Sequence, residues 1–227
     1  MPGALPRVHL VTPAIVERTV ARYGVQGILT DRERRMFEGF SHERRRDEWL
    51  SGRIAAKRAV RRVLGACDGS LPSYADVDVW NDVNGAPRLT IRHRPSLGGR
   101  LSVSISHTTG AGLAAVVDRA ESGSIGVDIE PTTTLPMPLI RRVMSPDERA
   151  RLDTGSESPS ALALWTAKEA ALKAASHLCS GLASIELFWK SGKCTSARVA
   201  GQAGGDCLIL VRHRTVGDFT IAAALCR

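Results

Sequence analysis

The chain has 227 residues, of which 43% are hydrophobic, and its formal net charge is +8. This length and composition allow one large domain or two small halves with a proper core, and they exclude a disordered chain. No apolar run approaches a membrane span and no apolar leader segment opens the chain, so we expect a cytoplasmic protein without a membrane partner. The basic excess indicates an anionic partner, which is nucleic acid, a phosphorylated small molecule or an acidic protein.

The cysteines do not form a recognisable motif. Their number is odd, and none is part of a C-x-x-C spacing. A disulfide framework and a zinc site are therefore not predicted, and a reducing compartment fits best. The positions concerned are Cys67, Cys179, Cys194, Cys207 and Cys226.

A helix is predicted over residues 41–64, with a serine at its N-cap and Gly65 just past its end. Its apolar residues recur every three or four positions, which places Arg46 and Arg53 at the edge of the buried stripe. Two interpretations stay open: these arginines cover core edges with their aliphatic stems, or their guanidinium groups bind phosphate. Gly52 costs about 1 kcal/mol relative to alanine inside a helix, which indicates a close approach to the backbone.

Four strands are predicted after this helix, because apolar and polar residues alternate between turn-forming residues. The third strand places three serines on one face and delivers His107 at its end. A single histidine is more often structural than functional, but this one is well placed to donate a hydrogen bond to an anion. The four strands span Tyr74–Trp80, Arg88–Arg92, Leu101–Ser106 and Leu113–Asp118.

The most regular alternation lies in residues 124–131, which predict a strand with one apolar face and one face carrying Gly126, Asp128 and Glu130. The two carboxylates lie roughly 7 Å apart along the strand, and the glycine leaves space beside them. Like charges so placed repel unless a cation lies between them. Mg²⁺ prefers such oxygen ligands. The alternative is a half-exposed strand with a solvated acidic face.

A polar connector at residues 119–124 predicts a boundary between two halves, residues 1–120 and 121–227. In the second half, the helix predicted over Ser160–Leu178 has Glu169 within its apolar stripe. Lys173 follows one turn later. A carboxylate on an inward stripe needs a buried ion pair or a metal. Further helices are predicted at residues 138–144 and from the Ser145–Glu148 capping box, and strands at Ser184–Lys190, Ser196–Ala200, Cys207–Arg214 and Asp218–Ala224.

Several of these segments together resemble one family. Gly126–Glu130 followed by Trp165–Lys173 resembles the paired signature of phosphopantetheinyl transferases. Ser104–His107, Arg45–Arg53 and Asn84–Pro87 resemble the Ser-x-Ser-His element, the arginine helix and the Gly-x-Pro turn of that family, in the same order. The chain is longer than the small trimeric carrier-protein synthases, so the resemblance is to the larger, monomeric, surfactin-type branch.

The resemblance implies an α+β fold of two similar halves, a pseudo-dimer, each with helices packed on a small antiparallel sheet and with the active site between them. Residues 1–120 would bind coenzyme A, and residues 121–227 would hold the metal site and the catalytic helix. The implied reaction transfers phosphopantetheine from coenzyme A to a serine of an apo acyl or peptidyl carrier protein. It would use Mg²⁺ and release adenosine 3′,5′-bisphosphate. The implied partners are free carrier proteins or carrier domains of polyketide or peptide synthases, and a monomer is expected.

The resemblance also implies roles for single residues. Asp128, Glu130 and Glu169 would bind the metal, and Glu169 would also accept the proton of the serine. Lys173 would act in catalysis by stabilising phosphate oxygens. Ala86 stands where relatives often carry a lysine that contacts the nucleotide, and Arg88 is a candidate replacement. The full set of implied coenzyme A contacts is Arg46, Arg53, Arg88, His107, Lys168 and Lys173.

A rival hypothesis is a non-catalytic basic module that binds nucleic acid through the arginine helix, because phosphate contacts dominate such binding. This alternative leaves the three carboxylates unexplained. It also lacks the aromatic side chains on which single-stranded bases stack, since aromatic residues make up 4% of the chain.

Overall fold

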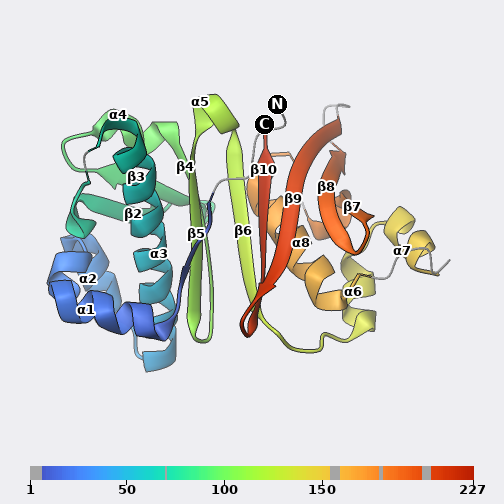
Figure 1. Cartoon of the computed structure of the whole chain (residues 1–227), viewed down its shortest axis with the longest axis horizontal. Coiled ribbons are helices and arrows are strands. Elements are labelled where there is room, and N and C mark those ends of the chain that lie inside the picture. Colours follow the sequence, from blue (N-terminus) through green and yellow to red (C-terminus); the bar gives the residue numbers. More distant parts are fainter. Residues whose placement is uncertain (1–6, 70, 154–158, 179–180, 201–205) are drawn as a thin grey trace. The chain divides into compact units, whose positions relative to one another are not determined.

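The computed structural model describes residues 7–69, 71–153, 159–178, 181–200 and 206–227. These residues form two compact units, which lie within Pro6–Glu121 and Ser122–Arg227. Each unit combines helices with antiparallel sheet, so the chain has a mixed α+β fold (Figure 1). Among the described residues, no helix is both long enough and apolar enough to cross a bilayer.

The first unit is organised around the long helix α3, Glu43–Asp68, which packs on strands β5 and β4. Its sheet has the order β1-β5-β4, and β2 and β3 form a separate hairpin whose strand β3 contacts β4. The remaining elements are β1 His9–Val11, α1 Pro13–Ile28, α2 Asp31–Glu38, η1 Tyr74–Asp76, β2 Val77–Asn81, β3 Pro87–Ile91, α4 Pro95–Arg100, β4 Leu101–Thr108, β5 Ala111–Asp118 and α5 Arg119–Ser122.

Helix α3 differs from its prediction at both ends. It begins after His42 and continues past Gly65 to Asp68, where Gly69 adopts the left-handed conformation that ends it. Gly65 instead gives room to the returning chain, since a Cβ there would lie 2.7 Å from a side-chain carbon of Leu71. Sequence pattern cannot separate a glycine that ends a helix from one that allows close packing.

The second unit holds one antiparallel sheet of order β6-β10-β9-β8-β7, with helix α8 packed against β6, β10 and β9. Helix α8 begins after Ser160, as predicted, but ends at Ala174, before the predicted Leu178. The Ser145–Glu148 capping box is confirmed by both of its hydrogen bonds. The elements are β6 Ser124–Pro131, α6 Met137–Val143, α7 Pro146–Asp153, α8 Ala161–Ala174, η2 Leu182–Ser184, β7 Ile185–Lys190, β8 Lys193–Ala200, β9 Asp206–Val216 and β10 Phe219–Cys226.

The two units repeat one order of elements. In each, a first strand is followed by a helix, a short capped helix, a long helix, a 3-10 turn and four further strands; α4, between β3 and β4, has no counterpart in the second unit. The strand order β1-β5-β4, continued in space by β3 and β2, corresponds to β6-β10-β9-β8-β7. The order of the predicted elements indicates two related α+β halves without a residue-level repeat, and the structure adds the matching strand order.

Candidate functional site

Strand β6 and helix α8 are held unusually close together at Gly126. A Cβ at this position would lie 1.9 Å from the carbonyl oxygen of Ala170 and 2.5 Å from the amide nitrogen of Ala174. The space predicted beside the carboxylates is therefore filled by the helix backbone and is not open to a ligand. The tight contact brings the acidic face of β6 against the helix that carries Glu169 and Lys173.

Asp128 forms an ion pair with Lys173 across this contact. Lys173 Nζ lies 2.7 Å from Asp128 Oδ1, and the side chains are 32% and 5% exposed. The carboxylate is thus buried, while the side chain of the lysine is partly exposed. The lysine therefore neutralises the strand carboxylate.

Glu130, two residues further along β6, is half-buried and accepts a 3.2 Å hydrogen bond from the indole nitrogen of Trp165. Burial raises the pKa of Glu130, and the neighbouring Asp128 carboxylate raises it further. The Trp165 hydrogen bond and Lys173 oppose these effects. Asp128 therefore acts on Glu130 as the alternation predicts.

Glu169 is half-buried on the same side of α8 as this acidic group. Burial raises the pKa of Glu169, Asp128 raises it further, and Lys173 lowers it. Lys173 makes an ion pair with Asp128. A carboxylate whose pKa is raised in this way is suited to accept a proton from a nearby hydroxyl.

The same three carboxylates are the expected metal ligands. The described part of the chain contains no set of three His, Cys, Asp or Glu side chains already arranged to hold a metal ion. The donor chemistry nevertheless fits Mg²⁺, which prefers carboxylate oxygens. Burial raises the pKa values of Glu130 and Glu169, and Asp128 adds to both shifts; a bound cation would relieve the repulsion between the carboxylates.

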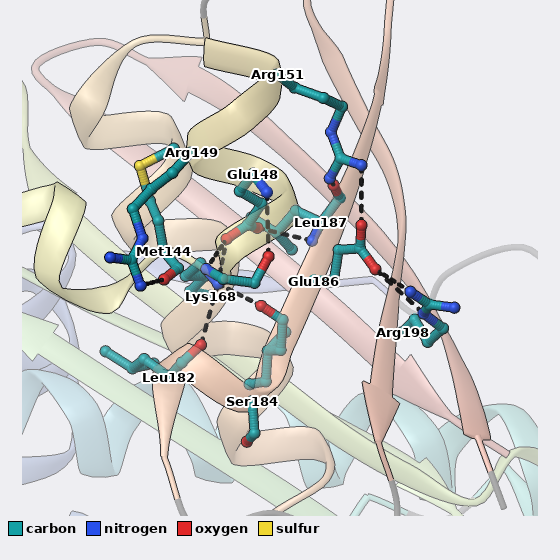
Figure 2. A network of polar contacts seen from close by, with 12 residues as sticks. Met144, Glu148, Arg149, Arg151, Lys168, Leu182, Ser184, Glu186, Leu187 and Arg198 are labelled. Atoms are coloured by element: carbon teal, nitrogen blue, oxygen red, sulfur yellow. Dashed lines mark hydrogen bonds and ion pairs between the residues drawn. The ribbon is translucent and has the colours of Figure 1, made fainter. Parts of the chain in front are cut away.

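Lys168 does not lie where a coenzyme A contact was expected, and that expectation is corrected. Its side chain is fully buried, and Nζ lies 2.8 Å from Glu148 Oε2. It also donates to the carbonyl oxygens of Leu182, at 3.0 Å, and Ile185 (Figure 2). A buried lysine with these three acceptors has no donor left for phosphate.

In the first unit, Arg53 is the most constrained of the predicted phosphate contacts. It is 5% exposed, and its guanidinium carbon lies 4.6 Å from the centre of the Trp49 ring. Its Nε lies 3.9 Å from a carboxylate oxygen of Glu33, which is too far for a hydrogen bond. That buried Nε has no hydrogen-bond partner among the described residues.

Arg46 lies two turns earlier on α3 and is more exposed, at 38% of its side chain. It contacts Glu43 at 3.5 Å and stacks over the ring of Phe37 at 5.4 Å. Its Nε, like that of Arg53, is buried and lacks a hydrogen-bond partner in the part of the chain that the structure describes. An anion acceptor would satisfy such a donor.

The structure brings His107 close to the arginine helix at Gly52. A Cβ on Gly52 would lie 3.1 Å from Ile105 and 3.5 Å from the His107 ring. The close approach that the glycine indicates is therefore that of strand β4. His107 itself is exposed.

Arg88 is placed differently from the other arginines. It is bound to Asp82, with Nε and Nη2 at 2.9 and 2.7 Å from Oδ2. The same aspartate accepts hydrogen bonds from the backbone of Asn84 and Ala86, so it fixes the turn that contains Ala86. The side chain of Arg88 is 45% exposed.

The sequence pattern does not reveal two tryptophans and one cavity of functional interest. Trp165 donates a hydrogen bond to Glu130, and Trp49 stacks against Arg53, but in the sequence both tryptophans are simply apolar positions of a helical stripe. A cavity of about 470 Å³ lies among α1, α2, the start of α3 and residues 109–111. None of the predicted site residues lines it.

Comparison with known proteins gives a consistent result. A model of the 4′-phosphopantetheinyl transferase superfamily matches residues 124–224. A holo-[acyl-carrier-protein] synthase of Staphylococcus aureus is 38% identical over 93 residues, which is 41% of this chain and 74% of that protein. A solved holo-(acyl-carrier-protein) synthase from Bacillus anthracis, in complex with CoA (3′,5′-ADP), is 26% identical and covers 50% of this chain and 94% of its own, with a TM-score of 0.39. The family match covers β6 and α8, which carry the acidic group.

Proposed function

The chain belongs to the 4′-phosphopantetheinyl transferase superfamily, and from this premise we propose that it transfers phosphopantetheine from coenzyme A to a serine of an apo carrier protein. The observation that carries the proposal is the acidic group of β6 and α8, in which Asp128 is ion-paired to Lys173 and burial raises the pKa of the nearby Glu169. A half-buried base beside a cation suits transfer of a phosphoryl-linked group to a hydroxyl.

In the proposed reaction the serine oxygen attacks the pyrophosphate phosphorus that bears pantetheine, and adenosine 3′,5′-bisphosphate leaves. Glu169 accepts the serine proton. Lys173 stabilises the non-bridging oxygens as negative charge grows on the leaving group. Asp128, Glu130 and Glu169 would hold Mg²⁺, which supplies charge neutralisation and orientation of the phosphates.

The first unit would supply the remaining contacts to coenzyme A. Arg46 and Arg53 each have a buried Nε that lacks a hydrogen-bond partner among the described residues, which fits phosphate recognition. His107, at the end of strand β4, lies beside Gly52, which is on the same helix as the two arginines. Arg88 remains a proposed contact, although it would have to give up part of its pairing with Asp82.

Membership of the larger, monomeric, surfactin-type branch is part of the proposal. It is supported by the second α+β unit and by the element order that the two units share. The proposed partners are free acyl carrier proteins and the carrier domains of polyketide or peptide synthases. The basic excess of the chain favours acidic partners of this kind.

The direct test is the mass of an apo carrier protein after incubation with coenzyme A and the enzyme. We expect a gain of one phosphopantetheine group that requires Mg²⁺ and disappears with a chelator. A panel of fatty-acid, polyketide and peptide-synthetase carriers would identify the accepted class. No mass change on any carrier, with folded enzyme and Mg²⁺ present, would reject the function.

A further inference from the structure

The second unit contains a buried lysine–glutamate pair, Lys168 with Glu148, that joins three elements (Figure 2). Glu148 closes the capping box of α7, accepting the backbone N–H of Ser145 at 2.7 Å. Its other oxygen accepts the N–H of Leu187 in β7 at 2.8 Å. Lys168 comes from α8 and also donates to backbone carbonyls at η2 and at the start of β7. The pair therefore fixes α8 to both α7 and β7.

The first unit contains a pair built in the same way, Lys57 with Glu33. Glu33 closes the capping box of α2 with Thr30. Its Oε2 lies 2.5 Å from Lys57 Nζ, and its Oε1 accepts the N–H of Val79 in β2 at 3.1 Å. Lys57 comes from α3, and its Nζ also donates to two carbonyl oxygens, those of Ile28 at 2.8 Å and Tyr74 at 3.0 Å.

The two pairs correspond in most of their contacts; they differ in the second carbonyl acceptor of the lysine, which is Ile28 at the end of α1 for Lys57 and Ile185 at the start of β7 for Lys168. Each glutamate is the third residue of a short capped helix, each lysine lies on the long helix of its unit, and all four side chains are buried, with both lysines 0% exposed. Each lysine also donates to a carbonyl in the 3-10 turn that precedes a strand. A buried ion pair is weak evidence for extra stability, because desolvation offsets its attraction, but it can specify one arrangement of elements.

Each pair lies beside proposed site residues of its own unit. Lys168 directly precedes Glu169 on α8, and the same helix is held to β6 at Gly126. Lys57 lies one turn after Arg53 on α3, and Glu33 is the carboxylate 3.9 Å from Arg53 Nε. The two pairs therefore lie next to two different groups, a proposed base and a proposed phosphate contact.

We propose that these pairs are separate positioning devices for the transfer reaction: the Glu148–Lys168 pair positions Glu169 and Lys173 for catalysis, and the Glu33–Lys57 pair positions Arg53 for binding coenzyme A. Neither lysine touches substrate. This inference rests on the proposed function. It assigns a role to Lys168 that differs from the expected phosphate contact.

The test uses two matched double variants, Glu148→Gln with Lys168→Met and Glu33→Gln with Lys57→Met. Both remove a buried ion pair as a whole and leave no unpaired buried charge. The single amide oxygen of each glutamine can still accept either the capping-box N–H or the strand N–H, but not both. Steady-state kinetics are measured with coenzyme A and an apo carrier, on protein whose folded fraction is checked by near-ultraviolet circular dichroism.

The first double variant should lower kcat about tenfold or more, because small displacements of catalytic groups are costly, with KM for coenzyme A within about threefold. The second should raise KM for coenzyme A about tenfold or more with kcat nearly unchanged, as expected for a contact made equally in ground and transition states. A purely structural role would change the folded fraction and neither kinetic constant of the folded enzyme.

Three outcomes would overturn the inference: both variants keep both constants, both change the same constant, or a double variant fails to fold. In the last case the pair is required for folding and has no separate role in positioning the site residues. The parent enzyme separates this inference from the proposed function. If the parent enzyme transfers nothing to any carrier, the proposed function is wrong. If the parent is active and both double variants have its kinetic constants, only the positioning role is wrong.

Discussion

Lys173 donates a 2.7 Å hydrogen bond to Asp128 Oδ1, although helix spacing alone would pair the lysine with Glu169 one turn earlier. The contact leaves Glu169 as a half-buried carboxylate whose pKa is raised by burial and by Asp128. A cation that binds to Asp128 would take over part of the charge neutralisation that Lys173 provides. The lysine could then turn to a phosphate oxygen.

Replacing Asp128 with Ala should lower transfer by roughly 10²-fold or more at saturating Mg²⁺, because a central charged contact of the site is lost. The fold should survive, because Lys173 is 32% exposed and can reach water when its partner is removed. Single-turnover transfer and thermal unfolding test the two parts. Glu130→Ala is the matched comparison and should be milder. Activity of Asp128→Ala within a few-fold of the parent would show that Asp128 is not a ligand.

Replacing Glu169 with Gln should lower kcat by roughly 10²-fold or more, because the amide cannot accept the serine proton. Coenzyme A affinity should be nearly unchanged, since the proposed arginine contacts do not involve Glu169. The two measurements are single-turnover transfer and coenzyme A binding with Mg²⁺ present. Retained transfer would reduce Glu169 to a structural helix residue.

Replacing Arg53 with Ala should raise KM for coenzyme A more than it lowers kcat. It should also destabilise the protein by about 1–3 kcal/mol, because a buried side chain stacked on Trp49 is removed. Arg58→Ala, an exposed position on the same helix, is the control. If Arg53 binds the ribose phosphate, dephospho-coenzyme A should lose much of its disadvantage in the variant. An unchanged preference between the two donors would assign Arg53 to another phosphate or to packing.

His213 should make the protein less stable in mild acid. Burial lowers the pKa of His213 and Lys193 lowers it further, while the neutral ring accepts the Cys194 N–H at 3.3 Å. The unfolded chain therefore binds a proton at higher pH than the folded chain. Stability should fall as the pH drops below about 6.5 and level off below the folded pKa.

Urea unfolding at several pH values, in the parent and in His213→Asn, measures this effect. His9 also has a lowered pKa, mainly through burial, and contributes to both proteins alike. The difference between the two curves therefore isolates His213. Parallel curves would mean that His213 titrates normally in the folded protein.

Cys207 and Cys226 should form a disulfide under mild oxidation, because their sulfur atoms lie 3.2 Å apart. Two thiols would lose two protons and two electrons to added glutathione disulfide. Burial raises the pKa of the Cys194 thiol to about 12, so that thiol should stay reduced. Closing the loop between positions 207 and 226 should stabilise the protein by about 3 kcal/mol.

Mass spectrometry of peptides would identify the bridge, and Cys207→Ser should abolish it. The bond would join the ends of β9 and β10. Failure to form it in the folded protein, with the same peptides bridging after denaturation, would show that the strands hold the sulfurs in an unsuitable geometry.

Local pattern predicts the parts of this site that depend on neighbouring residues. The alternation of residues 124–131 is confirmed as strand β6, and Ser160 caps α8. The effect of Asp128 on the pKa of Glu130, which adds to that of burial, also follows from their spacing. Each of these features is set by a single element, so its period is visible in the sequence.

The burial of Lys168 could not be predicted in the same way. Its partners are a carboxylate twenty positions earlier and carbonyls of the following turn and strand, which no helical period connects. The Lys57–Glu33 pair is missed for the same reason. Two T/S-x-x-E capping boxes, each followed by a long helix with a lysine in its apolar stripe, are the signal that could have revealed both.

Within each of the Lys57–Glu33 and Lys168–Glu148 pairs the positive and negative charges cancel, so neither pair contributes to the formal net charge of +8. That excess is therefore carried by other residues, most of them at the surface, where its field extends about 8–10 Å at physiological salt. Encounter with an acidic partner should consequently be accelerated by long-range attraction and slowed steeply by added salt. The bond-making step, which takes place among half-buried groups, should be much less sensitive to salt.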